Sequence, residues 1–267
     1  MNKKVLGIII AVVVVALAVG AYFIFSSSDY SLYSNAFKKT FDVNSMELDT
    51  SVKATVDDGM NISSTGNFKV TDMNANTQFI NSMNINGQSV VQFSDGSYIY
   101  TDDGSSKNKT RMGGDPEPKQ QEKDSDSFSF DAYISEFSGL LDASKIKELN
   151  AFEPIAEKYV DNIETVSVSG GKKFIVTLLP QAVDELVNTF INENLSNKNM
   201  SPTIDINSMT YTATVVSDYV SEIAFNIDMN VTAPGENTAK RASVDFVIKP
   251  VNPGQQVSFS LPSTDGF

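Results

Sequence analysis

Two runs near the C-terminal end decide the fold: MTYTATV at residues 209–215 and IAFNIDMNV at residues 223–231. In both runs apolar side chains alternate with polar or small ones. Successive side chains of an extended strand point to opposite faces, so this alternation predicts two β-strands, each with one dry face. The dry positions are Met209, Tyr211, Ala213, Val215, Ile223, Phe225, Ile227, Met229 and Val231.

The same alternation recurs through much of the chain and predicts an antiparallel meander in its first half. Asn86-Gly87 lies between two of these runs and is a strong hairpin signal. Asp-Asp-Gly at 57–59 is a further turn signal, because Asp caps a turn and Gly tolerates positive φ. The remaining expected strands lie at 46–56, 62–71, 77–85, 88–93, 98–101, 165–168, 172–179, 244–248 and 257–261.

Helical spacing occurs in three places. Tyr30, Tyr33, Phe37 and Phe41 recur at intervals of three or four and predict a short amphipathic helix. Two more helices are expected at 133–149 and, opened by a proline at its first position, at 180–195. Between 102 and 127 the periodicity is lost, and we expect a mobile acidic loop there. The predicted fold class is therefore α+β, mostly antiparallel β.

The composition excludes several kinds of chemistry. The 267 residues carry a formal charge of −13, so clustered phosphate contacts and nucleic-acid binding are not expected. The chain has no Cys and no His, which excludes a Ser-His-Asp triad, a thiol nucleophile and thiolate or imidazole metal ligands. The Asp-Asp-Gly sequences at 57–59 and 102–104 could supply oxygen ligands to Ca²⁺, but turn formation accounts for them and neither has the spacing of a calcium loop. We therefore expect no enzyme activity, no cofactor and no metal.

An N-terminal apolar run predicts a membrane anchor. Lys3 and Lys4 precede 21 residues without charge, at 5–25, which is long enough for one transmembrane helix. Lysines before the span and acidic residues after it predict an N-terminus inside and an extracytoplasmic domain at 29–267, with residues 1–28 as start and anchor. The alternative is a signal peptide cleaved near Ala18. A large outer domain without disulfides is typical of a Gram-positive-type cell envelope.

The order of helix, strands, loop, helices, two strands, helix and strands resembles the LolA/LolB and LppX/LprG group of extracytoplasmic lipid and lipoprotein carriers, which includes RseB-like sensor domains. The resemblance spans the predicted outer domain and rests on element order, with no shared motif. It implies an unclosed, curved antiparallel β-barrel with helices on its concave face and an apolar cavity between them. Two features depart from that pattern: a predicted membrane helix stands in place of a lipidated Cys, and the acidic loop at 102–127 is additional.

The resemblance implies a lipid or amphiphile as ligand, held by apolar side chains that face the cavity. The candidate lining residues are Val52, Ala54, Phe68, Val70, Phe79, Met83, Tyr98, Tyr100, Tyr211, Ala213, Phe225, Ile227, Met229 and Phe246. These residues could equally form a filled core against the helices. The chain is then expected to be either a membrane-tethered acceptor or sensor for a lipid or lipoprotein acyl chain, or an envelope interaction module that contacts another envelope protein and binds no ligand.

Overall fold

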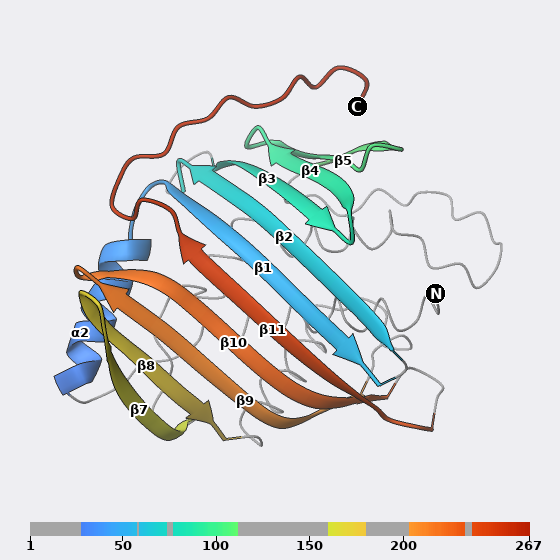
Figure 1. The fold of residues 1–267 in the computed structure, drawn as a ribbon. Helices are drawn as coiled ribbons and strands as arrows, with labels where there is room; N and C mark the ends of the chain where they lie inside the picture. The colour runs from blue at the N-terminus through green and yellow to red at the C-terminus, as the bar shows by residue number, and fades with distance from the viewer. Residues whose placement is uncertain (1–27, 58, 74–76, 112–159, 180–202, 233–236) are drawn as a thin grey trace.

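The computed structural model describes residues 28–57, 59–73, 77–111, 160–179, 203–232 and 237–267. These residues form one helix and one antiparallel sheet in the order β6-β5-β4-β3-β2-β1-β11-β10-β9-β8-β7 (Figure 1). The elements are α2 (Ser28–Phe41), β1 (Met46–Val56), β2 (Met60–Thr71), β3 (Gln78–Ile85), β4 (Gln88–Ser94), β5 (Tyr98–Asp102), β6 (Lys107–Arg111), β7 (Val160–Val168), β8 (Gly171–Leu178), β9 (Thr203–Val216), β10 (Tyr219–Thr232) and β11 (Lys240–Pro250).

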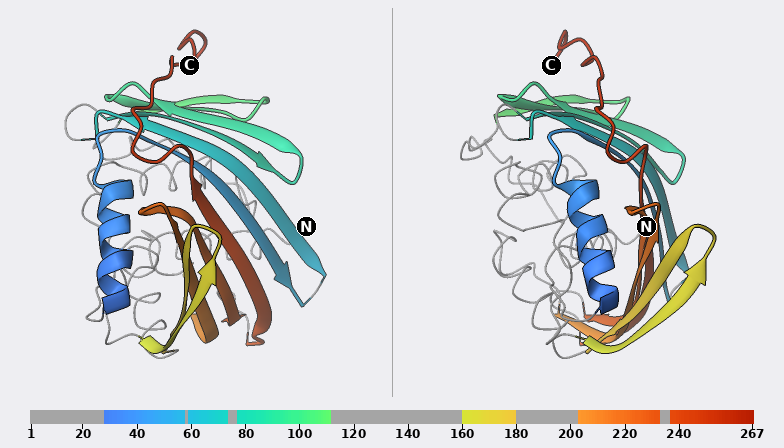
Figure 2. Two further views of the ribbon diagram at one scale, coloured as in Figure 1. Left: turned by 60° about the vertical axis from the view of Figure 1, so that its left-hand side comes forward. Right: turned by 90° about the vertical axis from the view of Figure 1, so that its left-hand side faces the viewer.

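The sheet consists of two meanders that meet at β1 and β11. Strands β1–β6 follow one another across one half of the sheet, and β7–β11 follow one another across the other half. The pairing of β1 with β11 runs from Leu48 opposite Pro250 to Val56 opposite Ala242. Strands β6 and β7 end the sheet on its two sides, so the barrel is unclosed, and the sheet curves around α2 (Figure 2). The prediction of a mostly antiparallel, unclosed β architecture is confirmed.

The strand register collects the apolar side chains on the face toward α2, which we call the concave face. Directly opposite residues in an antiparallel pair share a face, so register defines continuous rows across strands. One such row is Val52, Phe246, Phe225, Tyr211 and Val176, from β1 to β8. The rings of Phe225 and Phe246 stack at 6.1 Å and those of Tyr211 and Phe225 lie 5.0 Å apart. This row is the centre of the core.

Two tight turns fix the register of their hairpins. Asn86 and Gly87 join β3 to β4 with φ values of 50° and 90°, as the Asn-Gly signal predicts. Ser217 and Asp218 join β9 to β10 with φ values of 51° and 66°. Positive φ at both central residues is the type I′ geometry, whose twist matches that of paired strands.

The expectation of a loop over 102–127 is wrong at its beginning, where β6 pairs with β5. The turn between them is stabilised by Asp103, whose carboxylate accepts backbone N–H groups of Ser105 and Ser106 at 2.8 and 2.7 Å. Strand β6 contains only polar and charged residues, so hydrophobic alternation gives no signal for it. The remainder of the predicted loop, from 112 onward, lies outside the described residues.

The expected strand at 257–261 is also wrong. The segment after β11 crosses the outside of the sheet near β3–β5 without strand pairing (Figure 1). Both edges of β11 are already paired, one with β1 and the other with β10. The chain that follows β11 therefore has no free strand edge beside it to pair with. It is held instead by contacts such as that of the Val257 N–H, which donates to Ser45 Oγ at 3.0 Å.

The helix predicted around Tyr33 and Phe41 is confirmed as α2. The predicted anchor at 5–25 and the predicted helices at 133–149 and 180–195 lie outside the described residues. In the part of the chain that the structure describes, no helix has the length and apolar character needed to span a membrane.

Gly171 provides a test of the β8–β9 packing. A Cβ at this position would lie 1.8 Å from the carbonyl oxygen of Val215, so backbone must move to admit any side chain. We predict that Gly171→Ala lowers the free energy of unfolding by about 3 kcal/mol, as for other severe steric insertions. Urea denaturation followed by circular dichroism measures the loss.

The matched control is Gly59→Ala, in a turn with φ of +82° and no atom within 4 Å of an added Cβ. It should cost only about 1 kcal/mol, from the left-handed backbone alone. Equal losses for the two variants would contradict the close approach of β8 and β9.

Candidate functional site

The concave face brings together nearly all of the predicted lining residues. Strand register places them on one side of the sheet, from β3 through β1 and β11 to β9. Most are buried, whereas Phe68 and Met83 are half-buried. The residues that share this face are Val52, Ala54, Phe68, Val70, Phe79, Met83, Tyr211, Ala213, Phe225, Ile227, Met229 and Phe246.

The remaining two candidates, Tyr98 and Tyr100, lie on the opposite, outer face. Tyr100 stands opposite Phe93 in the β4–β5 pair, in a row that continues to outward residues of β3 and β2. The rings of Phe93 and Tyr100 stack at 4.9 Å, and Phe267 packs edge-on against both, at 5.6 and 5.3 Å. Strand β5 carries apolar side chains on both faces, with Ile99 on the concave face and the two tyrosines on the outer face. The sequence pattern alone therefore does not indicate which face of β5 points toward the core.

The outer aromatic cluster is tied to a turn by one hydrogen bond. Tyr100 donates its hydroxyl to Asp95 at 2.9 Å, and burial together with this carboxylate raises the pKa of Tyr100. Burial alone would raise the pKa of Asp95, but hydrogen bonds from the backbone of Tyr98 and Ser97 and from Tyr100 lower it overall. The Lys109 ammonium lies 4.1 Å from the centre of the Tyr98 ring. The cluster is a small outer core, separate from the concave face.

Helix α2 covers part of the concave face through its aromatic side. Tyr33 and Phe37 are buried, and their rings lie 4.9 Å apart. The Tyr33 ring also lies 5.6 Å from Phe174 of β8, and its hydroxyl hydrogen-bonds that of Tyr211 at 2.5 Å. Complete burial raises the pKa of Tyr211 strongly, and the bond to Tyr33 only partly offsets this effect, so the Tyr211 hydroxyl remains protonated at neutral pH.

The C-terminal turn of α2 is anchored at the β9–β10 hairpin. Thr40, a buried polar residue, donates its hydroxyl to the Ala36 carbonyl at 2.7 Å and accepts the backbone N–H of Val220 at 2.9 Å. Lys39 lies 3.5 Å from the Asp218 carboxylate and 4.3 Å from the centre of the Tyr219 ring. The hydrogen bond between Thr40 and Val220 could not be predicted from sequence periodicity. A single threonine within an amphipathic helix does not indicate that its hydroxyl bonds to a distant strand.

Charge is separated from the concave face along the first meander. Across the described strands β1–β6, register places no charged side chain on that face, and Glu47, Lys53 and Lys69 all lie on the outer face. The described residues also contain no cluster of three or more acidic side chains placed to hold a metal ion. The concave face of β1–β6 therefore offers apolar and uncharged polar groups.

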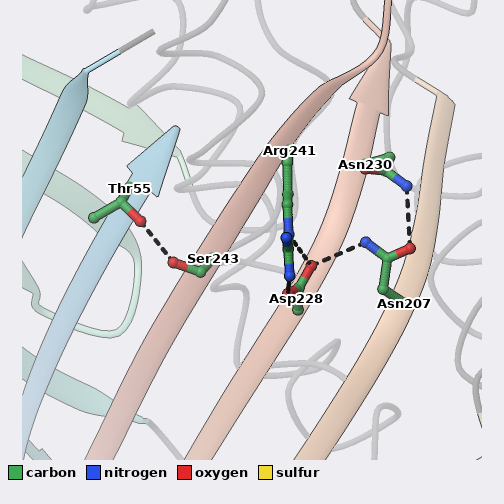
Figure 3. A network of polar contacts seen from close by, with 6 residues as sticks. All are labelled: Thr55, Asn207, Asp228, Asn230, Arg241 and Ser243. Atoms are coloured by element: carbon green, nitrogen blue, oxygen red, sulfur yellow. Dashed lines mark hydrogen bonds and ion pairs between the residues drawn. The ribbon is translucent and has the colours of Figure 1, made fainter. Parts of the chain in front are cut away.

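The outer face of the second meander is polar and satisfies its own hydrogen bonds (Figure 3). Asp228 accepts from Arg241 Nε at 3.0 Å and from Asn207 Nδ2 at 2.9 Å, and Asn230 donates to Asn207 at 3.0 Å. Hydrogen bonds from Arg241 and Asn207 hold the pKa of Asp228 below its ordinary value. This face is suited to water, in contrast to the opposite side of the same strands.

The Thr40 contact can be tested by an isosteric change. Thr40→Val removes the acceptor for the buried Val220 N–H, and we predict a loss of about 1–3 kcal/mol in the free energy of unfolding. Chemical denaturation of the variant measures the loss.

Thr55→Val is the control, because Thr55 is exposed on the outer face, where its hydroxyl bonds Ser243 at 2.6 Å. Its effect should stay within about 0.5 kcal/mol. If Thr40→Val were equally mild, the docking of α2 described above would be wrong.

Comparison with known proteins finds similarity at the level of structure alone. No family model matches the chain, and no curated protein matches it significantly. Among solved structures, it is similar to a LolA superfamily protein from Nitrosomonas europaea, with 8% identity and a TM-score of 0.26 over 84% of this chain and 94% of that chain. It also matches an N-terminal dehydratase from the difficidin assembly line, with 7% identity and a TM-score of 0.13 over 83% of this chain and 84% of that chain.

Proposed function

We propose that the concave face binds a lipid, a lipoprotein acyl chain or another amphiphile, and that the chain acts as a membrane-tethered extracytoplasmic binding protein. The observation that supports this most is the extent of the apolar face. It runs without a charged residue from β3 to β1, and it continues over β11, β10 and β9 as the rows of Phe225 and Ile227. Lys240, the first residue of β11, lies at the border of this face, opposite Val231.

This face is much larger than the one described helix that packs on it. A helix of 14 residues is about 21 Å long and about 10 Å wide. An 11-stranded sheet with strands about 4.8 Å apart is about 50 Å wide. Helix α2 packs chiefly on β9 and β10, so it covers a minor part of the apolar surface.

The energetics favour an aliphatic ligand. Each CH₂ group removed from water contributes about 0.8 kcal/mol, so a long acyl chain gains on the order of 10 kcal/mol before entropy costs. The half-buried Phe68 and Met83 at the β2–β3 side supply aromatic and flexible thioether contacts, which adapt to irregular ligands.

The role that fits a tethered protein is that of an acceptor or a sensor. A freely diffusing carrier would have to leave the membrane, which an uncleaved anchor at 5–25 prevents. An acceptor or sensor needs only to bind and release its ligand, and we assign no chemical reaction to the protein.

The competing function is an envelope interaction module without a ligand. It is favoured by one observation: most apolar side chains on the concave face of β8–β11 are almost fully buried, as a filled core would require. The two functions differ in whether space for an acyl chain exists between the sheet and the elements that cover it.

A fluorescent probe distinguishes them. N-phenyl-1-naphthylamine should bind residues 28–267, gain fluorescence, and be displaced by added monoacylglycerol or fatty acid. Ala54→Leu adds volume to the concave face and should weaken probe binding about tenfold, which corresponds to about 1.4 kcal/mol.

Thr55→Leu, the adjacent outward position, should bind as the unmodified protein does. Thermal unfolding of both variants checks that each retains its fold. Failure of the unmodified protein to bind the probe would favour the filled-core module.

A further inference from the structure

Residues 255–267 lie across the outside of the sheet near β3–β5 without joining it as a strand (Figure 1). We call this segment the strap. Its apolar side chains alternate with polar ones as in a strand: Val257, Phe259 and Leu261 are half-buried, whereas the serines between them are exposed. The strap therefore lies on the outer face as an extended peptide with one apolar side.

The far end of the strap packs on the outer aromatic cluster of β4 and β5. The Phe267 ring stands nearly perpendicular to the rings of Phe93 and Tyr100, at interplanar angles of 89° and 81°. The Lys107 ammonium of β6 lies 4.8 Å from the centre of the Phe267 ring and donates to the Asp265 carbonyl at 3.2 Å. Phe93 and Tyr100 point outward and are nevertheless buried, so the strap is part of what covers them.

Few hydrogen bonds attach the strap to the rest of the described domain. Its 13 residues make two, from Lys107 to Asp265 and from the Val257 N–H to Ser45 Oγ at 3.0 Å. Others are internal to the strap, such as that from the Asp265 N–H to Ser263 Oγ at 3.1 Å. Segments with few hydrogen bonds to their surroundings open at a low cost in free energy. We therefore expect the strap to leave the sheet and return while the strands beneath it stay folded.

The turn that leads into the strap has the properties of a hinge. Pro253 is flanked by Asn252 and Gly254, which have positive φ values of 48° and 81°. A Cβ added to Gly254 would lie 2.5 Å from the hydroxyl oxygen of Tyr219, so glycine suits this turn in two ways. The left-handed backbone directs the strap back across its own sheet. With the strap extended away from the domain, both residues are free to adopt ordinary negative φ.

A displaced strap leaves a site that the strap of a second copy fits equally well. An exchanged pair makes the same contacts as a single copy, so the two arrangements differ only in the hinge and in the cost of association. Charge also favours a second copy as the partner. Lys107, Lys109 and Arg111 of β6 all lie on the outer face, whereas the whole chain carries a formal charge of −13. This basic strand attracts an acidic chain to the site.

We infer that the outer face of β4–β6 is a docking site for the strap of a second copy of this chain, and that two copies exchange straps through the hinge at 252–254. The inference is independent of amphiphile binding, which is proposed for the opposite face of the sheet. The alternative is a strap that covers only its own sheet and never occupies the site of another copy.

The test uses introduced cysteines, because the chain has none of its own. Two full-length chains with different affinity tags are co-expressed in a bacterium, one with Lys107→Cys and the other with Asp265→Cys. Intact cells are treated with a short, membrane-permeable bismaleimide, and products that carry both tags are quantified by immunoblotting. We expect at least about fivefold more of this product than from a control pair in which Lys53→Cys, an exposed outward position of β1, replaces Lys107→Cys.

A hinge variant distinguishes strap exchange from ordinary association of two copies. Gly254→Ala in the Asp265→Cys chain strains the turned hinge and should raise the yield of the two-tag product about fivefold. Gly59→Ala is the matched control, because it places a Cβ on a left-handed residue, with φ of +82°, at the other end of β1. Its yield should equal that of the parent pair.

Three results would overturn the inference. A two-tag yield no higher than that of the Lys53→Cys control would show that the strap binds only its own sheet. Equal responses to Gly254→Ala and Gly59→Ala would show an ordinary contact between copies. A single chain with both Lys107→Cys and Asp265→Cys should give the linked peptide pair in the band of monomer mass, and its absence would show that the strap does not lie on β6. None of these results bears on the proposed amphiphile site.

Discussion

The pairing of β1 with β11 is the constraint on which the rest of the structure depends. It joins residues about 190 positions apart in the sequence and unites two meanders that are otherwise separate. Without it, the row from Val52 through Phe246 and Phe225 to Tyr211 would be cut between Val52 and Phe246, and the apolar faces of the two meanders would not be joined. Such long-range pairing must be formed against the entropy of closing a long loop, so we expect it to be a late and slow step of folding.

Curvature and helix docking follow from that pairing. The united sheet bends around α2, which is fixed by the Tyr33–Tyr211 hydroxyl pair at one side and by the Thr40 bridge to Val220 at the other. Because α2 begins directly after the predicted anchor, its orientation would also set how the concave face sits relative to a membrane. The outer face, with its Asn–Asp–Arg network, remains in water.

Much of this fold could be predicted from the sequence, because strands with one dry face carry a period-two pattern. That pattern located β1–β5 and β7–β11, and it assigned the concave side chains of β9 and β10 correctly. It missed β6, which has no apolar residue, and it wrongly predicted a strand at 257–261, where alternation occurs without an available partner strand. Local periodicity contains no information about which distant strands pair, so the meeting of β1 and β11 was not predictable from it.

The candidate site shows the same limit on a smaller scale. Tyr98 and Tyr100 alternate as lining residues would, yet the register of β4 with β5 turns both outward, where Tyr100 packs against Phe267. A search for apolar residues also passes over Asn81, although it lies in phase with Phe79 and Met83 and so shares their face.

The concave apolar face, which carries no charged side chain on the described strands of the first meander, is the feature on which the proposal of amphiphile binding rests. The most direct measurement is native mass spectrometry of residues 28–267 purified from a bacterial host, followed by organic extraction of any bound species. The account predicts a co-purifying mass that extracts as a lipid. A single mass equal to that of the protein alone, unchanged after incubation with bacterial membrane lipids, would contradict it.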